Sequence, residues 1–304
     1  MGGRRKRLAD RASALLGPRL GLWVTDEPPN TSPVIVDDPR LQAYDASGRG
    51  VAVDVSFEAG RLHVFPLGGD VAHPWVEALR SAFRSGDGRE LQRTLAAYYG
   101  LVAPAGPHEW LGLESGAVPG LRGFPPGAVV EPWGTTRPDE SLRALRARQE
   151  RERRGYGLPP DMVPGSPAFG PMVEPQIEAE CEKLRHLASS IRRHGLQADR
   201  ADYDVGGVFL IRDDQWCWIA GAGRHRLAVA RALGITGARV GVRAVVRREE
   251  VGLWPRVADG TFSRDGALAV FDRFMEGRVP AVVEPWRAWL AKRDARCAGG
   301  MEAE

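Results

Sequence analysis

The chain has 304 residues and a mass of 33.1 kDa, with 43% hydrophobic and 27% charged residues, as is typical of a folded globular protein. Its formal net charge of +3 is too small to indicate a nucleic-acid-binding protein by itself. No run of about 18 apolar residues is present, so the sequence predicts no membrane span. The basic N-terminus lacks the apolar run of a secretory signal, and the cysteine usage favours a reducing cytoplasm.

Residues 1–103 are expected to form a separate N-terminal α+β region, whose role the sequence does not indicate. Residues 51–57 alternate between apolar and polar side chains as a strand does, and residues 61–65 are expected to return as the second arm of a hairpin. Helical periodicity predicts two helices after the hairpin, over residues 75–84 and 87–100.

Residues 104–168 are expected to form a proline- and glycine-rich connector, because more than half of the 23 prolines lie between residues 104 and 175. Within this connector, residues 139–154 predict one strongly charged helix. Its arginines are interleaved with glutamates and no aromatic residues join them, which favours a solvated linker helix over a nucleic-acid surface.

Residues 169–250 alternate between helical and strand patterns, and residues 251–304 are expected to form a helical extension. The elements expected are a helix over 178–195, strands over 208–211 and 216–219, a helix over 224–233, a strand over 240–246 and helices over 264–276 and 284–293. Ser263 is the expected N-cap of the helix over 264–276. The whole pattern predicts a mixed α/β, or α+β, fold.

The strongest functional signal lies between the strand over 216–219 and the following helix. Glycines there let the backbone approach a ligand closely, and the N–H groups at a helix start point outward. Cationic side chains surround this point, so the sequence predicts an anion site, with phosphate as the expected anion. The residues expected to bind it are Gly221, Gly223, Arg224, His225 and Arg226.

Other sites find less support in the sequence. The same glycines also fit the start of a dinucleotide-binding fingerprint. However, Arg226 stands where the third glycine is needed, and the strand over 216–219 is expected to form a hairpin with the strand over 208–211 rather than to open a β-α-β unit. The histidines and cysteines lack metal-ligand spacing, so no protein metal site is predicted.

Two motifs together resemble the ParB/sulfiredoxin-like domain. The first is the L-x-x-L-x-x-S-I pattern from Leu184 to Ile191, and the second is the box Gly223-x-His225-Arg226 at the expected distance after it. The resemblance covers about residues 169–250, less than a third of the chain. It implies a nucleotide-binding domain in which this box holds the phosphates of a nucleoside triphosphate, ATP or CTP, with Mg²⁺. The activities known in that superfamily include CTP-dependent chromosome partition, ATP-dependent sulfinic-acid repair and phosphorylation of free serine.

The chain departs from each subfamily at its distinguishing residue. Arg224 stands where the repair enzymes have a catalytic cysteine and where the partition proteins usually have glutamate. Ala222 stands where the serine kinases usually have aspartate. The residues after 249 show no helix-turn-helix pattern, so the sequence does not favour DNA as a partner, and a DNA-associated role remains only as an alternative.

The serine kinases have a glutamate shortly before the equivalent helix that deprotonates the substrate hydroxyl, so the resemblance implies a carboxylate base here. Glu174, Glu178 and Glu180 lie in that vicinity, with Glu174 and then Glu178 as the preferred candidates, and Arg224 is the candidate that stabilises developing charge. Acidic residues at a helix start are also favoured by the helix dipole alone. The leading expectation is an NTP-dependent phosphotransferase acting on a small hydroxyl-bearing molecule. The alternative is a non-catalytic, nucleotide-responsive switch or assembly protein, in which nucleotide tightens a homodimer.

Overall fold

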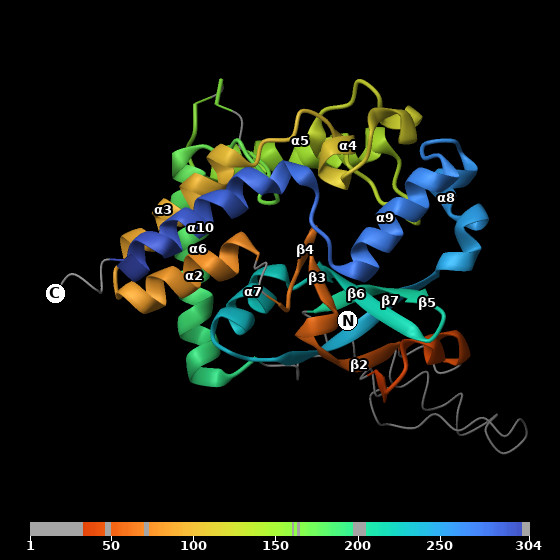
Figure 1. The fold of residues 1–304 in the computed structure, drawn as a ribbon, viewed down its shortest axis with the longest axis horizontal. Coiled ribbons are helices and arrows are strands. Elements are labelled where there is room, and N and C mark those ends of the chain that lie inside the picture. The colour runs from red at the N-terminus through yellow and green to blue at the C-terminus, as the bar shows by residue number, and fades with distance from the viewer. Residues whose placement is uncertain are drawn as a thin grey trace, which may run out of the picture.

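The computed structural model describes residues 33–45, 50–69, 73–159, 161–162, 165–196 and 205–299, with side chains up to residue 296. In this part of the chain, one seven-stranded mixed sheet lies between two layers of helices (Figure 1). The predicted mixed α/β class is confirmed. The expected basic start of the chain lies outside the described residues.

The sheet has the strand order β1-β2-β7-β5-β6-β3-β4. The strands are β1 (Val34–Val36), β2 (Val51–Ser56), β3 (Gly60–Leu62), β4 (Phe65–Pro66), β5 (Gly206–Arg212), β6 (Gln215–Ala222) and β7 (Gly237–Arg247). The pairs β1–β2, β7–β5 and β6–β3 are parallel, and the other neighbours are antiparallel. The central three strands come from residues 206–247 and are flanked on both sides by strands from residues 34–66. The sheet is thus shared by two segments that the sequence pattern assigns to different units.

The expected hairpin between residues 51–57 and 61–65 is wrong. Strands β2 and β3 are separated in the sheet by β7, β5 and β6. Strand β2 instead pairs antiparallel with β7, with Val53 opposite Val240. The chain leaves β2 through a short 3-10 helix at Phe57–Ala59, whose first turn is capped by the hydroxyl of Ser56. The alternation of apolar and polar side chains predicts where the backbone is extended. It does not predict which strands pair, because pairing depends on segments far away in the sequence.

The helices divide into groups around the sheet (Figure 1). One layer contains α2 (Pro74–Ser85), α3 (Gly88–Leu101), α6 (Glu174–His194), α7 (Arg224–Ala232) and α10 (Glu284–Gly299). The other contains α8 (Pro255–Ala258) and α9 (Arg264–Glu276), while α4 (Pro107–Leu111) and α5 (Pro138–Gly155) lie beyond one end of the sheet. The expected Ser263 cap of α9 is confirmed, because its hydroxyl accepts from the amide of Gly266 at 3.0 Å. Helix α6 begins at Glu174, four residues before the expected start.

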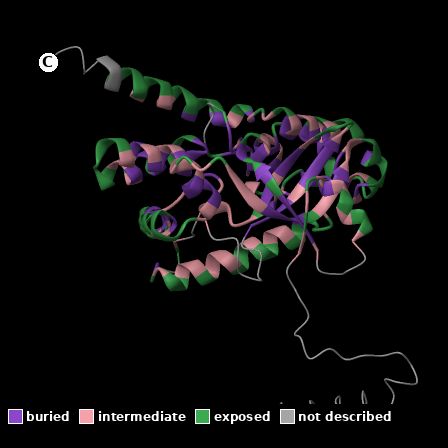
Figure 2. Ribbon diagram, turned by 90° about the horizontal axis from the view of Figure 1, so that it is seen from below, coloured by how far each residue is buried: buried purple, intermediate pink, exposed green. Residues whose placement is uncertain are grey.

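Burial is concentrated on the sheet and on the helix surfaces that face it (Figure 2). Neighbouring residues on the central strands point to opposite faces. Phe209 and Trp218 pack with the layer that contains α2, α3, α6 and α7, whereas Leu210 and Cys217 pack with α9. The strands that carry the predicted site are therefore covered on one face by helices from both halves of the chain, and on the other by α9.

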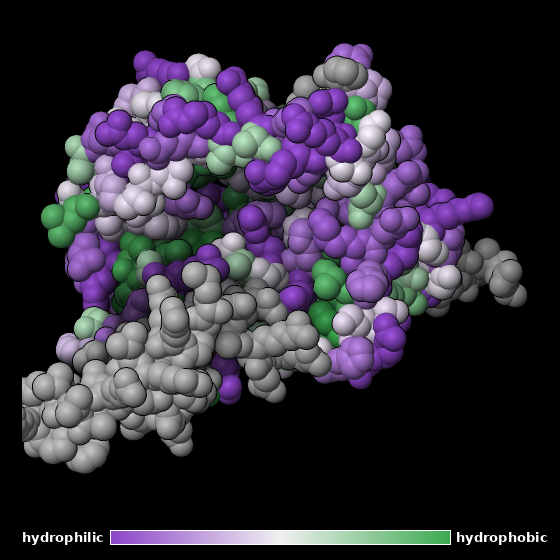
Figure 3. Space-filling view, turned by 180° about the vertical axis from the view of Figure 1, so that it is seen from behind, coloured by the Kyte–Doolittle hydropathy of each residue, from purple (hydrophilic) through white to green (hydrophobic). Residues whose placement is uncertain are grey.

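No helix among the described residues combines the length and the apolar character needed to cross a bilayer. Seen from behind, the surface is hollowed, with hydrophobic side chains deep in the hollow and hydrophilic residues around it (Figure 3).

Candidate phosphate-binding site

The turn between β6 and α7 has the geometry of an anion site. Gly223 adopts a left-handed conformation, with φ 72° and ψ 14°, and occupies the N-cap position of α7. A glycine has no side chain with which to cap the helix, and it reaches this conformation without the strain that other residues would suffer. Helix α7 is nine residues long, and its first turn carries Arg224, His225 and Arg226. This arrangement brings backbone N–H groups and cationic side chains to one point.

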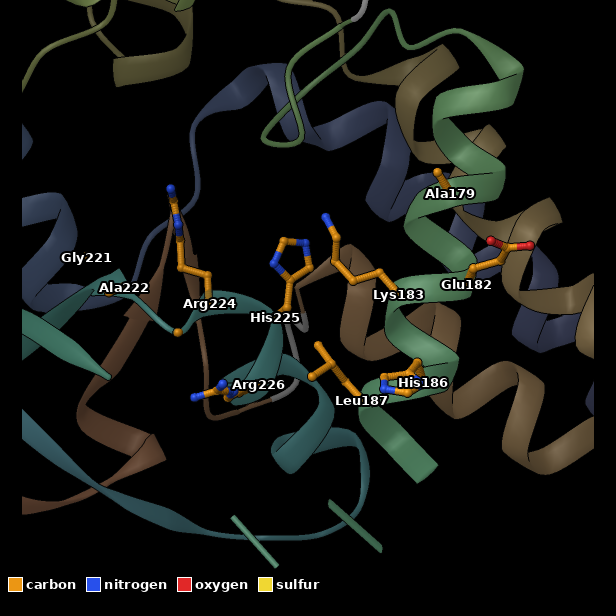
Figure 4. A pocket seen from close by; sticks show the side chains of 11 residues that line it. Ala179, Glu182, Lys183, His186, Leu187, Gly221, Ala222, Arg224, His225 and Arg226 are labelled. Atoms are coloured by element: carbon orange, nitrogen blue, oxygen red, sulfur yellow. The ribbon is translucent and has the colours of Figure 1, made fainter. Parts of the chain in front are cut away.

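A cleft of about 950 Å³ lies between this turn and helix α6, and we call it the β6–α7 cleft (Figure 4). It is lined by Ala179, Glu182, Lys183, His186, Leu187, Gly221, Ala222, Gly223, Arg224, His225 and Arg226. All five residues that the sequence predicts to bind phosphate therefore line one cleft. The sequence pattern did not single out Lys183, which extends from α6 toward His225 (Figure 4).

A buried carboxylate connects Lys183 to His225. Glu180 is only 3% exposed, and its two oxygens contact Nε2 of His225 and, at 3.1 Å, Nζ of Lys183. Burial raises the pKa of Glu180, but the hydrogen bond from His225 and the nearby ammonium of Lys183 outweigh burial, so the pKa lies below its ordinary value. Glu180 is therefore an ionised residue that orients the imidazole ring of His225.

Aromatic residues from the N-terminal part of the chain also hold this ring. Trp75 stacks on His225 with ring centres 4.1 Å apart and planes inclined by 15°. Trp75 Nε1 donates a hydrogen bond to the hydroxyl of Tyr99 at 3.2 Å, and that hydroxyl donates to the backbone oxygen of Pro167 at 3.1 Å. Helices α2 and α3 thus supply a rigid support for the first turn of α7.

Of the three glutamates considered as bases, the two preferred ones lie elsewhere. Glu174 begins α6 and Glu178 follows one turn later, but both are exposed and neither lines the β6–α7 cleft. The carboxylate that meets the predicted box is Glu180. Glu180 is the least preferred of the three from the sequence, although its helical spacing with Ile177 and Leu184 places it on the buried face of α6.

Arg224 lies between the β6–α7 cleft and a second cavity, of about 440 Å³, since it lines both. Desolvation lowers the pKa of Arg224, and the positive charge of Arg148 lowers it further, while Glu131 acts in the opposite direction. The position of Arg224 is therefore compatible with its predicted role beside a reacting phosphate, between two spaces that can hold small molecules.

No group of three or more potential metal-binding side chains occurs among the residues that the structure describes. Of the residues that line the β6–α7 cleft, Glu182 contributes a carboxylate. These residues do not form a protein-held magnesium site, so any Mg²⁺ would be held by the oxygens of a bound triphosphate.

Comparison with known proteins found no relative of this chain. The chain matches no protein-family model, no curated protein and no solved structure. The resemblance to the ParB/sulfiredoxin-like domain therefore stays a prediction from the sequence motifs.

Proposed function

We propose that the protein binds a nucleoside triphosphate in the β6–α7 cleft and transfers its terminal phosphoryl group to a small hydroxyl-bearing molecule. One observation carries this proposal: a left-handed glycine turn, the start of α7 and three cationic side chains line the same cleft. The cationic residues are Lys183, Arg224 and Arg226. The volume of about 950 Å³ is at the upper end of the range for small-molecule sites, which is sufficient for a nucleotide.

The charges of the cleft favour the phosphate end of the nucleotide. A hydrogen bond between an ionised donor and an anion contributes about 1.5–3 kcal/mol, roughly twice the contribution of a neutral pair. Phosphates at the start of α7 would also interact favourably with the helix dipole. The side chain of Glu180 is turned to His225 and Lys183 and is almost fully buried, so it stabilises these two groups beside the cleft.

The transfer step requires a group that accepts a proton. The acceptor oxygen forms a bond to the terminal phosphorus while the bond from that phosphorus to the bridging oxygen breaks, and the nucleoside diphosphate leaves. His225 takes the hydroxyl proton: its Nε2–H donates to Glu180, so Nδ1 carries the lone pair. Glu180 then stabilises the imidazolium ion, much as a buried carboxylate does in other histidine-based sites. Mg²⁺ bound to the phosphates would neutralise part of their charge.

The test is a transfer assay with γ-labelled ATP and CTP and a panel of acceptors: serine, glycerol and 3-phenyllactate. We expect labelled acceptor and one equivalent of nucleoside diphosphate with at least one pair. In His225→Asn, we expect transfer at saturating nucleotide to be at least about 100-fold slower. Nucleotide binding accompanied by a change in sedimentation, with no diphosphate formed in the presence of any acceptor, would refute transfer and support the non-catalytic switch.

A further inference from the structure

The second cavity that Arg224 lines is enclosed by helix α5, the start of α7 and the segment 166–169, and we call it the α5 cavity. Part of its wall is apolar, formed by Trp110, Leu145 and Phe169 among others. Its volume of about 440 Å³ lies within the range of small-molecule sites. An apolar wall with a few charged groups is the usual composition of such a site.

The charged groups of this wall are unbalanced. Arg148, Arg151 and Arg224 line the α5 cavity, and Glu131 is the acidic residue among the described residues that line it. The Nε atom of Arg148 is buried and has no hydrogen-bond partner, although it forms an ion pair with Glu152, whose carboxylate oxygen lies 3.7 Å away. Cations that share a cavity repel one another, and an anion bound between them would remove that repulsion.

Two histidines add a neutral donor to the same wall. His73 Nδ1 accepts a hydrogen bond from the amide of Trp75 at 3.2 Å, so the proton of His73 is on Nε2. That proton is donated to His63 Nδ1, 3.2 Å away, which leaves the proton of His63 on its Nε2. Burial and the surrounding positive charges hold the pKa of both histidines well below the ordinary value. His63 therefore brings a neutral N–H donor to the wall of the α5 cavity.

We propose that the α5 cavity is the acceptor site, and that its ligand is a small molecule in which an anionic group, carboxylate or phosphate, is joined to an apolar body and carries a hydroxyl. The anionic group binds between Arg148 and Arg224, and the apolar body packs on Trp110 and Phe169. Since Arg224 lines both cavities, a hydroxyl at that end of the ligand reaches the β6–α7 cleft. The role as acceptor site rests on the proposed function, whereas anion binding in the α5 cavity does not.

The test uses three probes that share one aromatic ring: benzoate, phenyl phosphate and the neutral benzyl alcohol. Binding to the full chain is measured by calorimetry. We expect one of the two anions to bind at least about tenfold more tightly than benzyl alcohol, the fold-change of one charge-assisted hydrogen bond. The anion that binds more tightly identifies the natural ligand as a carboxylate or a phosphate.

Two arginines of α5 provide a matched pair of variants. Arg148→Ala removes a cavity residue, and we expect it to abolish the preference for the anion. Arg146→Ala removes an exposed arginine of the same helix and should retain that preference. Equal binding of anions and benzyl alcohol, or an equal effect of the two substitutions, would overturn the proposal.

A nucleotide titration of Arg148→Ala separates this inference from the proposed function. Unchanged nucleotide affinity together with lost anion binding supports two distinct sites. Anion binding that depends on Arg148, in a protein that binds no nucleotide, would support the anion site but overturn its role as an acceptor site.

Discussion

The buried pair Glu180–His225 makes a specific prediction about stability. In Glu180→Gln the side chain keeps its volume and one acceptor oxygen but loses its charge. A hydrogen bond to a charged group contributes about 1.5–3 kcal/mol, against about 0.5–1.5 kcal/mol for a neutral pair. The contact with Lys183 contributes less, since that ammonium is about half exposed. Because the pKa of Glu180 is lowered in spite of its burial, the favourable contacts outweigh desolvation. We expect the substitution to reduce the free energy of unfolding by roughly 1–2 kcal/mol at pH 7.5.

The pH dependence of this loss follows from the direction of the pKa shift. A carboxyl group whose pKa is lower in the folded state stabilises that state fully above its unfolded value of about 4.5. The stabilisation disappears as the pH falls through the folded pKa, where the carboxyl group becomes protonated. The difference between wild type and Glu180→Gln should therefore be constant above this range and decrease below it.

The assay is urea unfolding followed by fluorescence, at pH values from 7.5 to 3.5. Glu178→Gln is the control, because Glu178 is exposed on the same helix. Equal losses in the two variants would refute the assignment of Glu180 as a buried, ionised partner of His225. A loss in Glu180→Gln that is the same at pH 3.5 as at pH 7.5 would refute it as well.

Two further predictions concern packing and titration. Gly170→Ala would place a Cβ atom 1.7 Å from the backbone oxygen of Tyr99, so we expect the free energy of unfolding to fall by about 3 kcal/mol. In Gly100→Ala the new Cβ atom meets open space on helix α3, so we expect the free energy of unfolding to rise by roughly 0.5 kcal/mol. Thermal unfolding of both variants checks this, and similar melting temperatures would contradict it. Because His63 and His73 have pKa values well below 6.5, the folded state binds fewer protons than the unfolded state, and stability should fall below pH 6.5 by about 1.4 kcal/mol per pH unit for each histidine. Urea midpoints at pH 7.5 and 5.5 test this. His73→Asn keeps an acceptor that can cap α2 and should reduce the loss of stability between the two pH values, whereas an unchanged loss would contradict the prediction.

Local features of the chain could be predicted from the sequence with few errors. The helix that ends at Gly195, the two strands before Gly223 and the cap at Ser263 all follow from side-chain periodicity and from residues with special backbone preferences. The turn at Gly223 before α7 follows from the same kind of signal. These features depend on residues within a few positions of one another, so no tertiary information is needed.

The features that could not be predicted depend on long-range contacts. The apolar alternation of β2 and β3 predicts strands, but their order in the sheet depends on β7, β5 and β6, which come much later in the chain. The contact between Glu180 and His225 joins residues 45 positions apart, and the stacking of Trp75 on His225 spans a longer interval. The exposed Glu174 is preferred as a base for its position in the sequence, whereas the packing of α6 on α7 shows that Glu180 is the carboxylate in contact with His225.

The central claim, a phosphate site in the β6–α7 cleft, is tested most directly by calorimetric titration of ATP, CTP and GTP with Mg²⁺. The titration compares wild type with Lys183→Ala, which removes a cation of the cleft, and with Arg185→Ala, which removes an exposed cation of the same helix outside it. We expect one nucleotide to bind the wild type and Arg185→Ala equally, and Lys183→Ala about tenfold or more weakly. No binding of any nucleotide to the wild type, or equal binding to both variants, would contradict the assignment of the cleft as a phosphate site.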